Sequence, residues 1–438
     1  MSEHTPSPAS RRDFLKTSAA VAGATLASGL VVPAVHAGGS DMLKIGLIGC
    51  GSRGTGAAMQ ALRADKNTRL VAMGDVFADH LEGSLKLLRA EGDIGDRVTV
   101  TPDTSFTGFT AYKQVLENVD VVLLATPPGF RPIHLEAAVK AGKHIFCEKP
   151  MAVDGPGVKR VLAAAAEAKR KNLSLVSGFC WRRHPVMRET MERLHAGAVG
   201  DFTALQAVYN TGQTWSPRKR EPGWSDMEHQ LRNWWFYTWL SGDFNVEQHV
   251  HSLDKAAWAM KNEYPVRAVG LGGRQVRTGP EFGNIYDHHA VVYEYASGVK
   301  AFSYCRHHEG AASDVSDHYF GTQGTCDVIA KFPPKVTITG PNAWKSKAEK
   351  DDPKLDMYQI EHNELFACIR AGKPINDGEW MAKSTLMAIM GRMATYTGQV
   401  IEWAAALNSK EDLSPKVYDM KASLPEPKVA MPGLTKFV

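Results

Sequence analysis

Three glycines in a fixed pattern are the first residues whose spacing points to chemistry. The segment "LKIGLIGCGSRGTG" places Gly49, Gly51 and Gly54 after an apolar run and before a segment with helical spacing. In this setting G-x-G-x-x-G predicts a tight loop whose backbone N–H groups hold a pyrophosphate at a helix N-terminus. A second apolar run, "TRLVAMGD", ends in Asp75, whose carboxylate suits the hydroxyls of a ribose. Together these residues predict a dinucleotide-binding domain.

The type of dinucleotide follows from the charges near this loop. A carboxylate at Asp75 repels a 2′-phosphate, so we expect NAD in preference to NADP. Arg53, inside the glycine loop beside Ser52, leaves NADP open as the alternative. We expect Ser52 and Arg53 to contact the cofactor together with the glycines.

Two further apolar runs end in residues that strand interiors rarely contain. "VDVVLLATPP" ends at Thr126 and Pro127, and "KHIFCEKP" ends at Glu148 and Lys149 before Pro150. Ligands of parallel α/β sheets bind outside the carboxyl ends of the strands. We therefore expect both ends to lie over the cofactor.

The elements that must position these residues alternate between strands and helices. We expect strands at 97–100, 120–126, 144–150 and 173–179, and helices at 78–90, 111–117, 132–141 and 155–171. Such alternation predicts a doubly wound parallel sheet, an α/β Rossmann domain, over residues 43–178.

Beyond residue 178 the pattern changes. Residues 181–245 look irregular and contain a cluster of five tryptophans, and a helix is expected at 246–260. About five longer alternating strands follow, and "YEYASGVKAF" carries a hairpin turn at Ser297-Gly298. Helices at 357–370 and 379–396 should close this domain. We expect an α+β domain over 179–404 with a large, mostly antiparallel open sheet and helices on one face, followed by a tail at 405–438.

At this point the sequence resembles the Gfo/Idh/MocA oxidoreductases, which include glucose–fructose oxidoreductase and inositol dehydrogenase. The resemblance rests on the glycine loop, on the "TPP…H…AGKH…EKP" run with His134, and on "NVEQHVHSLDKAAW". It implies that His134 lies at the cofactor and that Lys149 reaches a substrate hydroxyl beside the nicotinamide. It also implies that an acid and a histidine four residues apart, here Glu247 and His251, complete the site. The family usually has aspartate where this chain has Glu247.

These residue types suit the oxidation of an alcohol. Hydride leaves carbon for the nicotinamide while a base removes the hydroxyl proton. Lys149 can hold the hydroxyl, and His251 is the natural base near neutral pH. On a helix Glu247 would share a face with His251 and could orient it. Residues expected at the substrate are Arg182, Trp235, His249 and Tyr286.

Other interpretations stay open. Lys149 could be a solvated strand-end lysine, and His251 a structural histidine. Glu247, His249 and His251 could form a metal site if the backbone there is extended, with Asp287, His288 and His289 as further ligands; we expect no metal. The tryptophan cluster could belong to a core or an oligomer contact, or it could stack on sugar faces.

The first residues have the pattern of an export signal. "SRRDFLK" precedes a weakly apolar Ala/Gly-rich stretch that ends in small residues near Ala37. The paired arginines match the twin-arginine pattern, so we expect residues 1–37 to direct export to the periplasm. A membrane anchor is the alternative, although the stretch is short and Ala/Gly-rich for a spanning helix.

The composition narrows the class of protein. The 438 residues are 44% hydrophobic and 22% charged, which is typical of a globular protein with two domains. A formal charge of +4 without a Lys/Arg block argues against a nucleic-acid partner. The six cysteines show no paired spacing, so we expect free thiols.

The leading hypothesis is therefore an exported NAD enzyme that acts on a hydroxyl of a sugar, glycoside or polyol. The periplasm offers no obvious soluble nicotinamide pool, so a tightly bound cofactor should be regenerated in place. The alternatives are a redox-neutral glycoside hydrolase or epimerase and a non-catalytic sugar-binding protein. Too few helices are expected to cover both faces of the second sheet, which predicts a homodimer or homotetramer through the open face.

Overall fold

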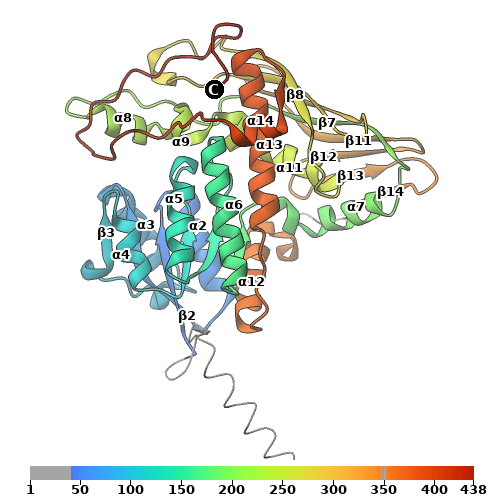
Figure 1. The fold of residues 1–438 in the computed structure, drawn as a ribbon. Helices are drawn as coiled ribbons and strands as arrows, with labels where there is room; N and C mark the ends of the chain where they lie inside the picture. Colours follow the sequence, from blue (N-terminus) through green and yellow to red (C-terminus); the bar gives the residue numbers. More distant parts are fainter. Residues whose placement is uncertain (1–40, 348, 350–351) are drawn as a thin grey trace, which may run out of the picture. The chain divides into compact units, whose positions relative to one another are not determined.

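The computed structural model describes residues 41–347, 349 and 352–438, and the predicted export signal lies outside them. Residues 42–438 form one compact unit built around two β-sheets (Figure 1). Both sheets confirm the expected fold class.

The first sheet has six parallel strands in the order β3-β2-β1-β4-β5-β6. This is the strand order of the dinucleotide-binding fold, in which the order reverses between β1 and β4 and opens a crevice at their carboxyl ends. The strands are β1 (Leu43–Ile48), β2 (Thr68–Asp75), β3 (Ser105–Thr107), β4 (Val121–Leu124), β5 (His144–Cys147) and β6 (Leu175–Ser177).

Helices cover both faces of this sheet and close two separate apolar layers. One layer joins β1 to α2 (Ser52–Ala64), α3 (Ala78–Ala90) and α12 (Met357–Arg370). The other packs α4 (Ala111–Glu117), α5 (Arg131–Lys140) and α6 (Gly155–Arg170) against the opposite face. Strands buried on both sides explain the continuous apolar runs in the sequence.

Two expectations for this part of the chain are wrong. Residues 97–100 form no strand: Val98 makes an isolated bridge to Leu70, and the edge of the sheet is β3. Helix α12, expected in the second domain, packs on the first: Leu365 and Phe366 belong to the apolar layer of α2. The other boundaries of the predicted domains stay predictions.

The second sheet has nine strands in the order β14-β13-β12-β11-β7-β10-β9-β8-β15. Every pair in it is antiparallel except β7 with β10. The strands are β7 (Phe202–Thr211), β8 (Arg267–Gly273), β9 (His288–Glu294), β10 (Lys300–His307), β11 (Asp314–Gly321), β12 (Thr325–Ile329), β13 (Lys335–Ile338), β14 (Trp344–Lys345) and β15 (Ile401–Glu402). The hairpin at Gly298 joins β9 to β10 as expected.

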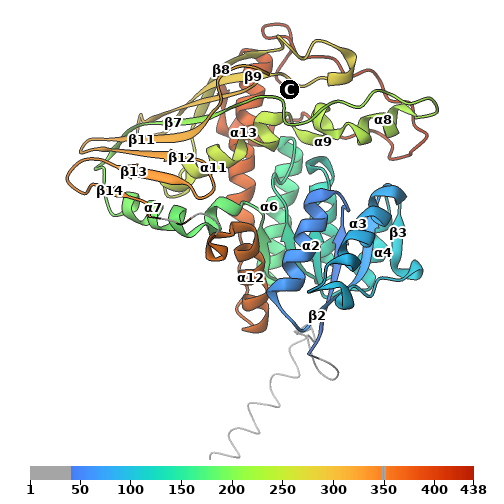
Figure 2. The ribbon, with the colours of Figure 1, turned by 180° about the vertical axis from the view of Figure 1, so that it is seen from behind.

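Helices lie on one face of this sheet, as Figure 2 shows for α7 (Pro185–His195) and α11 (Val250–Ala259). The long helix α13 (Gly378–Thr397) packs on β8 and on α6, so it joins the two sheets (Figure 1). Along β9 buried and half-buried residues alternate, and Val291 and Tyr293 are buried beneath the helices. The opposite face leaves Leu271 78% exposed.

Residues 181–245 are more regular than expected. They contain α7, the central strand β7, and the short helices α8 (Asp226–Arg232) and α9 (Thr238–Ser241). The helix expected at 246–260 is interrupted: α10 (Phe244–Glu247) ends before α11 begins at Val250. The His249 N–H reaches back to the carbonyl of Phe244, which widens the turn between the two helices.

After the short helix α14 (Trp403–Asn408) an extended tail runs back over the second domain (Figure 1). The main-chain carbonyls of the tail hold it in place. The N–H of Met227 donates to the carbonyl of Ala422, and the hydroxyl of Tyr286 donates to the carbonyl of Ala430. All six cysteines are free and buried. Within the described residues, none of the helices is both long and apolar enough to span a bilayer.

Candidate active site

The glycine loop has the conformation that its pattern predicts. Gly49 has φ +97°, and a Cβ on Gly54 would lie 1.9 Å from the carbonyl oxygen of Gly49. A Cβ on Gly51 would have no neighbour within 4 Å, so the space before the N-terminus of α2 is open. Helix α2 begins at Ser52 and points its free N–H groups at this space. The loop therefore forms a cradle for a phosphate group.

Asp75 lies at the end of β2, beside this loop. Its carboxylate accepts hydrogen bonds from the N–H groups of Cys50, at 2.6 Å, and Phe77, at 2.9 Å. Burial raises the pKa of Asp75, and these two donors oppose the rise. Arg53 points elsewhere: its Nε lies 2.7 Å from Glu148, and its Nη2 donates to Gln60.

The ends of β4 and β5 are clamped together by a buried arginine. Arg131, only 1% exposed, donates from Nη1 to the carbonyl of Leu124 and from Nε to that of Pro150. His134 lies next to it, with Nδ1 3.1 Å from the Thr126 hydroxyl. Burial and the charge of Arg131 lower the pKa of His134 to about 3. The imidazole of His134 is therefore neutral at physiological pH.

Lys149 is held by Glu247 from the second domain. Its Nζ donates to Oε1 of Glu247 at 2.9 Å and to the main-chain carbonyl of Glu247 at 2.6 Å. The two side chains are 14% and 12% exposed. The Glu247 carboxylate therefore orients Lys149.

His251 follows one turn later, at the start of α11. Its Nδ1 is buried and has no hydrogen-bond partner among the described residues. Burial, and then the charges of Lys149 and Lys255, place its pKa far below the usual range. His251 is therefore neutral at pH 7 and able to accept a proton.

One cavity of about 1010 Å³ joins the glycine loop to Lys149, Glu247 and His251. The residues expected at the cofactor all line it: Gly49, Gly51, Ser52, Arg53, Gly54, Asp75, Thr126, Pro127, His134, Glu148 and Lys149. A nucleotide at the loop and a substrate at Lys149 would thus share one enclosure.

Comparison with known families agrees with this geometry. Residues 43–176 match the Gfo/Idh/MocA model, described as an oxidoreductase family with an NAD-binding Rossmann fold. Residues 8–28 match the twin-arginine translocation signal. Residues 43–176 therefore form an NAD-binding domain of the Gfo/Idh/MocA oxidoreductase family. The signal sequence indicates export by the twin-arginine pathway.

Relatives of this protein carry two kinds of name. "Glycosyl hydrolase family 109 protein 2" of Shewanella sp. (strain ANA-3) is 25% identical over 81% of this chain and 80% of its own. "Inositol 2-dehydrogenase" of Serratia proteamaculans is 24% identical over 77% of this chain and 89% of its own.

Solved structures share the fold. Aldose-aldose oxidoreductase from Caulobacter crescentus, complexed with glycerol, has a TM-score of 0.64 at 18% identity and covers 82% of this chain and 99% of its own. Levoglucosan dehydrogenase, complexed with NADH and L-sorbose, has a TM-score of 0.66 at 16% identity over 83% and 99%.

Of the four residues expected at the substrate, only Trp235 lines the cavity. Arg182 is buried against Asp254, with Nη2 2.7 Å from Oδ1, and stacks on Trp380. His249 is covered completely and its Nε2 lies 2.7 Å from the Ser303 hydroxyl. Tyr286 is held by the tail. None of these three side chains lines the cavity, because each is engaged by other parts of the chain, so their role at the substrate stays a prediction.

Other residues line the cavity that were not expected there. Gln248 follows the predicted Glu247, and Arg131 lies between the predicted Pro127 and His134, but nothing in the sequence showed which way they point. Tyr358 reaches the cavity from α12, whose packing on the first domain was not foreseen. Trp215 and Trp234 belong to the tryptophan cluster, which was the available signal.

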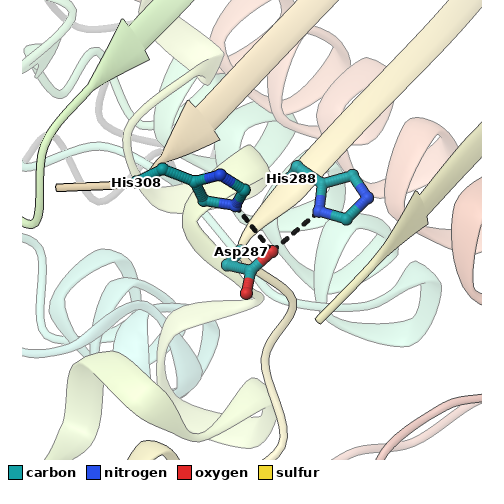
Figure 3. A group of neighbouring side chains, drawn as sticks. All are labelled: Asp287, His288 and His308. Carbon is teal, nitrogen blue, oxygen red and sulfur yellow. Dashed lines mark hydrogen bonds and ion pairs between the residues drawn. The ribbon is translucent and has the colours of Figure 1, made fainter. Parts of the chain in front are cut away.

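The metal alternative required an extended backbone at 247–251, but Glu247 ends α10, Val250 begins α11, and the two residues between them have right-handed helical backbone angles. A different group of possible ligand atoms, on Asp287, His288 and His308, lies within 4.8 Å of one another (Figure 3). His288 Nδ1 and His308 Nε2 both bond Oδ1 of Asp287, at 2.7 and 3.1 Å. Backbone N–H groups of 275–277 bond its Oδ2, so loop capping accounts for this carboxylate.

Proposed function

We propose that the protein is an exported, NAD-dependent oxidoreductase acting on a hydroxyl of a sugar, glycoside or polyol in the periplasm. The observation that carries the proposal is the position of Lys149, held by Glu247 and near His251, in the cavity that begins at the glycine loop. The sugar or polyol class draws on relatives and neighbours named for inositol, aldoses and levoglucosan.

The residues of the loop fit a dinucleotide. The open space at Gly51 admits a pyrophosphate. A side chain at this position would project into that space and narrow it. Arg53, the arginine of the glycine loop, is paired with Glu148, and the basic side chain in contact with Asp75 is His80, at 3.7 Å. This pairing favours NAD over NADP.

Three groups of the chain can act on the alcohol. An ammonium has three donors, and two of those on Lys149 bond Glu247, so the third is left for the oxygen of the substrate hydroxyl. Neutral His251 accepts the hydroxyl proton. A bound nicotinamide would supply the acceptor for the hydride on the carbon that carries this hydroxyl, so that the alcohol would become a carbonyl compound. Glu247 fixes Lys149 throughout.

A nucleotide that stays bound during export has no soluble nicotinamide pool to exchange with in the periplasm. It must therefore return to its starting redox state while it is bound to the protein. A second sugar can return the hydride, or the product itself can take it back. In the second case transient oxidation acidifies a neighbouring C–H bond and permits elimination, hydrolysis or epimerisation. The glycosyl hydrolase family 109 relatives favour this redox-neutral alternative.

Two measurements test the proposal. Mass spectrometry of the small molecule released from purified protein should show NAD. The protein should then be mixed with a panel of sugars, polyols and glycosides while the absorbance of reduced nicotinamide and the products are followed. A keto-sugar with reduced cofactor supports oxidation, and aglycone release without net reduction supports the redox-neutral cycle.

Lys149→Ala should abolish either product, whereas Lys140→Ala, an exposed lysine on α5, should not. Binding of sugars with no product in the wild-type protein would overturn the proposal in favour of a binding protein.

A further inference from the structure

Three tryptophans line the same cavity as Lys149 and His251. Trp235 is 4% exposed, whereas Trp215 is 42% exposed. An exposed indole on the wall of a cavity is available to a ligand, and its face is both apolar and electron-rich.

The rings form a ladder with nearly parallel steps. Trp235 stacks on His307 with centroids 6.3 Å apart and planes at 10°, and Trp215 stacks on Trp235 at 5.7 Å and 18°. Trp234 meets both other indoles edge-on, at 5.7 and 5.6 Å. Trp235 is thus covered from both sides, and Trp215 and the half-buried Trp234 carry the free surface.

The inner end of the ladder lies at the residue that follows Glu247. Arg277 Nη2 lies 2.8 Å from His307 Nδ1, and an arginine can only donate, so the proton of the neutral ring is on Nε2. That Nε2 donates at 2.5 Å to the side-chain oxygen of Gln248, the residue after Glu247. The ladder therefore starts beside Glu247 and reaches outward to Trp215.

The outer end is held in place. Asn233, only 4% exposed, accepts from the Arg218 N–H at 2.6 Å and donates to the Arg218 carbonyl at 3.1 Å. This pair of bonds ties the loop that carries Trp215 to the turn that carries Trp234 and Trp235. The aromatic wall is thus fixed before any ligand arrives.

We propose that Trp215 and Trp234 form a subsite for the second ring of a glycoside, the aglycone or neighbouring sugar of the ring that is oxidised. This inference rests on the proposed function. His307 bonds Gln248 next to Glu247, the partner of Lys149, and it lies two ring separations from Trp215. Trp215 is therefore placed for a part of the substrate beyond the ring whose hydroxyl bonds Lys149. The C–H face of a pyranose, or an aryl ring, can stack there. The substrate class is therefore a glycoside with a ring-sized aglycone.

The test compares three glycosides of the same turned-over sugar: methyl, phenyl and a disaccharide. In the wild-type protein, kcat/KM for the phenyl glycoside and the disaccharide should exceed that for the methyl glycoside by about tenfold, the scale of one stacking contact. Trp215→Ala should remove this advantage and leave the methyl glycoside unchanged, and Trp215→Phe should keep part of it. Trp344→Ala, a half-buried tryptophan on β14 outside the cavity, is the matched control.

An equal effect of Trp215→Ala on all three glycosides, or no effect, overturns the subsite. If free sugars or polyols are turned over and no glycoside is, the proposed function stands and the subsite is overturned. If none of the three classes is turned over, the proposed function fails and the subsite is tested by calorimetric binding of the phenyl glycoside. Binding lost in Trp215→Ala and kept in Trp344→Ala then supports it, and absence of binding to the wild-type protein overturns it.

Discussion

Lys149 Nζ donates to both the carboxylate and the main-chain carbonyl of Glu247, a residue 98 positions later in the chain. One bond depends on the side chain and the other does not, so substitution of Glu247 loosens Lys149 without releasing it. The contact also joins the strand end of the first domain to the helix α10 of the second. The cavity is therefore complete only when both domains are in place.

Loss of either proposed proton-handling residue should stop turnover. Lys149→Ala and His251→Ala are each expected to lower turnover at least about 10²-fold, the scale of a lost acid–base group. Bound cofactor, measured by mass spectrometry, should stay at the wild-type amount because the glycine loop is untouched. Near-normal turnover in either variant would remove that residue from the mechanism.

Glu247→Asp should reduce kcat more than it changes KM. The shorter side chain withdraws the carboxylate from a 2.9 Å contact with Lys149, while the bond to the main-chain carbonyl stays. We expect about a tenfold lower kcat, within the range for a misplaced acid–base group. Steady-state kinetics would check this, and an unchanged or higher kcat would show that either acid serves.

The pH dependence of kcat/KM should reflect a base with a low pKa. Burial holds the pKa of His251 well below 6.5, and its neutral form is the active one. Activity should therefore persist as pH falls through 6.5 and decline only when pH approaches the lowered pKa. The assignment would be contradicted if kcat/KM of the wild-type protein already declined at pH 6.5 or above and the residual activity of His251→Gln showed no such decline.

Asp75 should control the retention and the type of cofactor. Asp75→Ala removes the acceptor that we assign to the ribose hydroxyls and also frees the Cys50 N–H in the glycine loop. We expect less NAD in the purified protein and an improved relative affinity for NADP, measured by calorimetry on the cofactor-free protein. NADP as the sole cofactor of the wild-type protein would refute the assignment.

The open sheet face should form a contact between subunits. Leu271, Ala290 and Tyr304 lie opposite one another on β8, β9 and β10, and Leu271 and Tyr304 are 78% and 38% exposed. We expect light scattering at micromolar concentration to give a dimer or tetramer. Leu271→Glu should shift the mass toward the monomer, and Val417→Glu, an equally apolar exposed site on the tail, should not. A monomeric wild-type protein would exclude the contact.

The sequence was most informative where local rules decide the structure. The strand–loop–helix pattern placed Gly49, Gly51 and Gly54 correctly, and the rule for carboxyl strand ends placed Lys149 in the cavity. Contacts across the domains were beyond such rules. Glu247 was expected to orient His251 on one helix, but the interruption at Gln248 and the distant Lys149 give it another partner.

Other misjudged segments have tertiary causes. Strand β7 lies in the middle of the second sheet, yet its sequence "FTALQAVYNT" mixes polar and apolar residues on both faces and adjoins a tryptophan-rich stretch. Helix α12 reads as an ordinary amphipathic helix, and the sequence does not say that Leu365 meets the layer of α2. Arg182 was expected at the substrate, but in the structure its guanidinium pairs with Asp254 and stacks on Trp380.

The tail has a consequence for the order in which the molecule is made. The Ser225 hydroxyl donates to the carbonyl of Met420, 195 residues later, so α8 behind the aromatic wall is fastened by chain that the ribosome adds much later. The strands and helices around the glycine loop are synthesised before residue 178, but α12 completes their apolar layer only after residue 370, and the wall is fastened only when residues near 420 have emerged. Both the nucleotide-binding domain and the substrate wall should thus be completed late, shortly before the folded protein meets the export machinery.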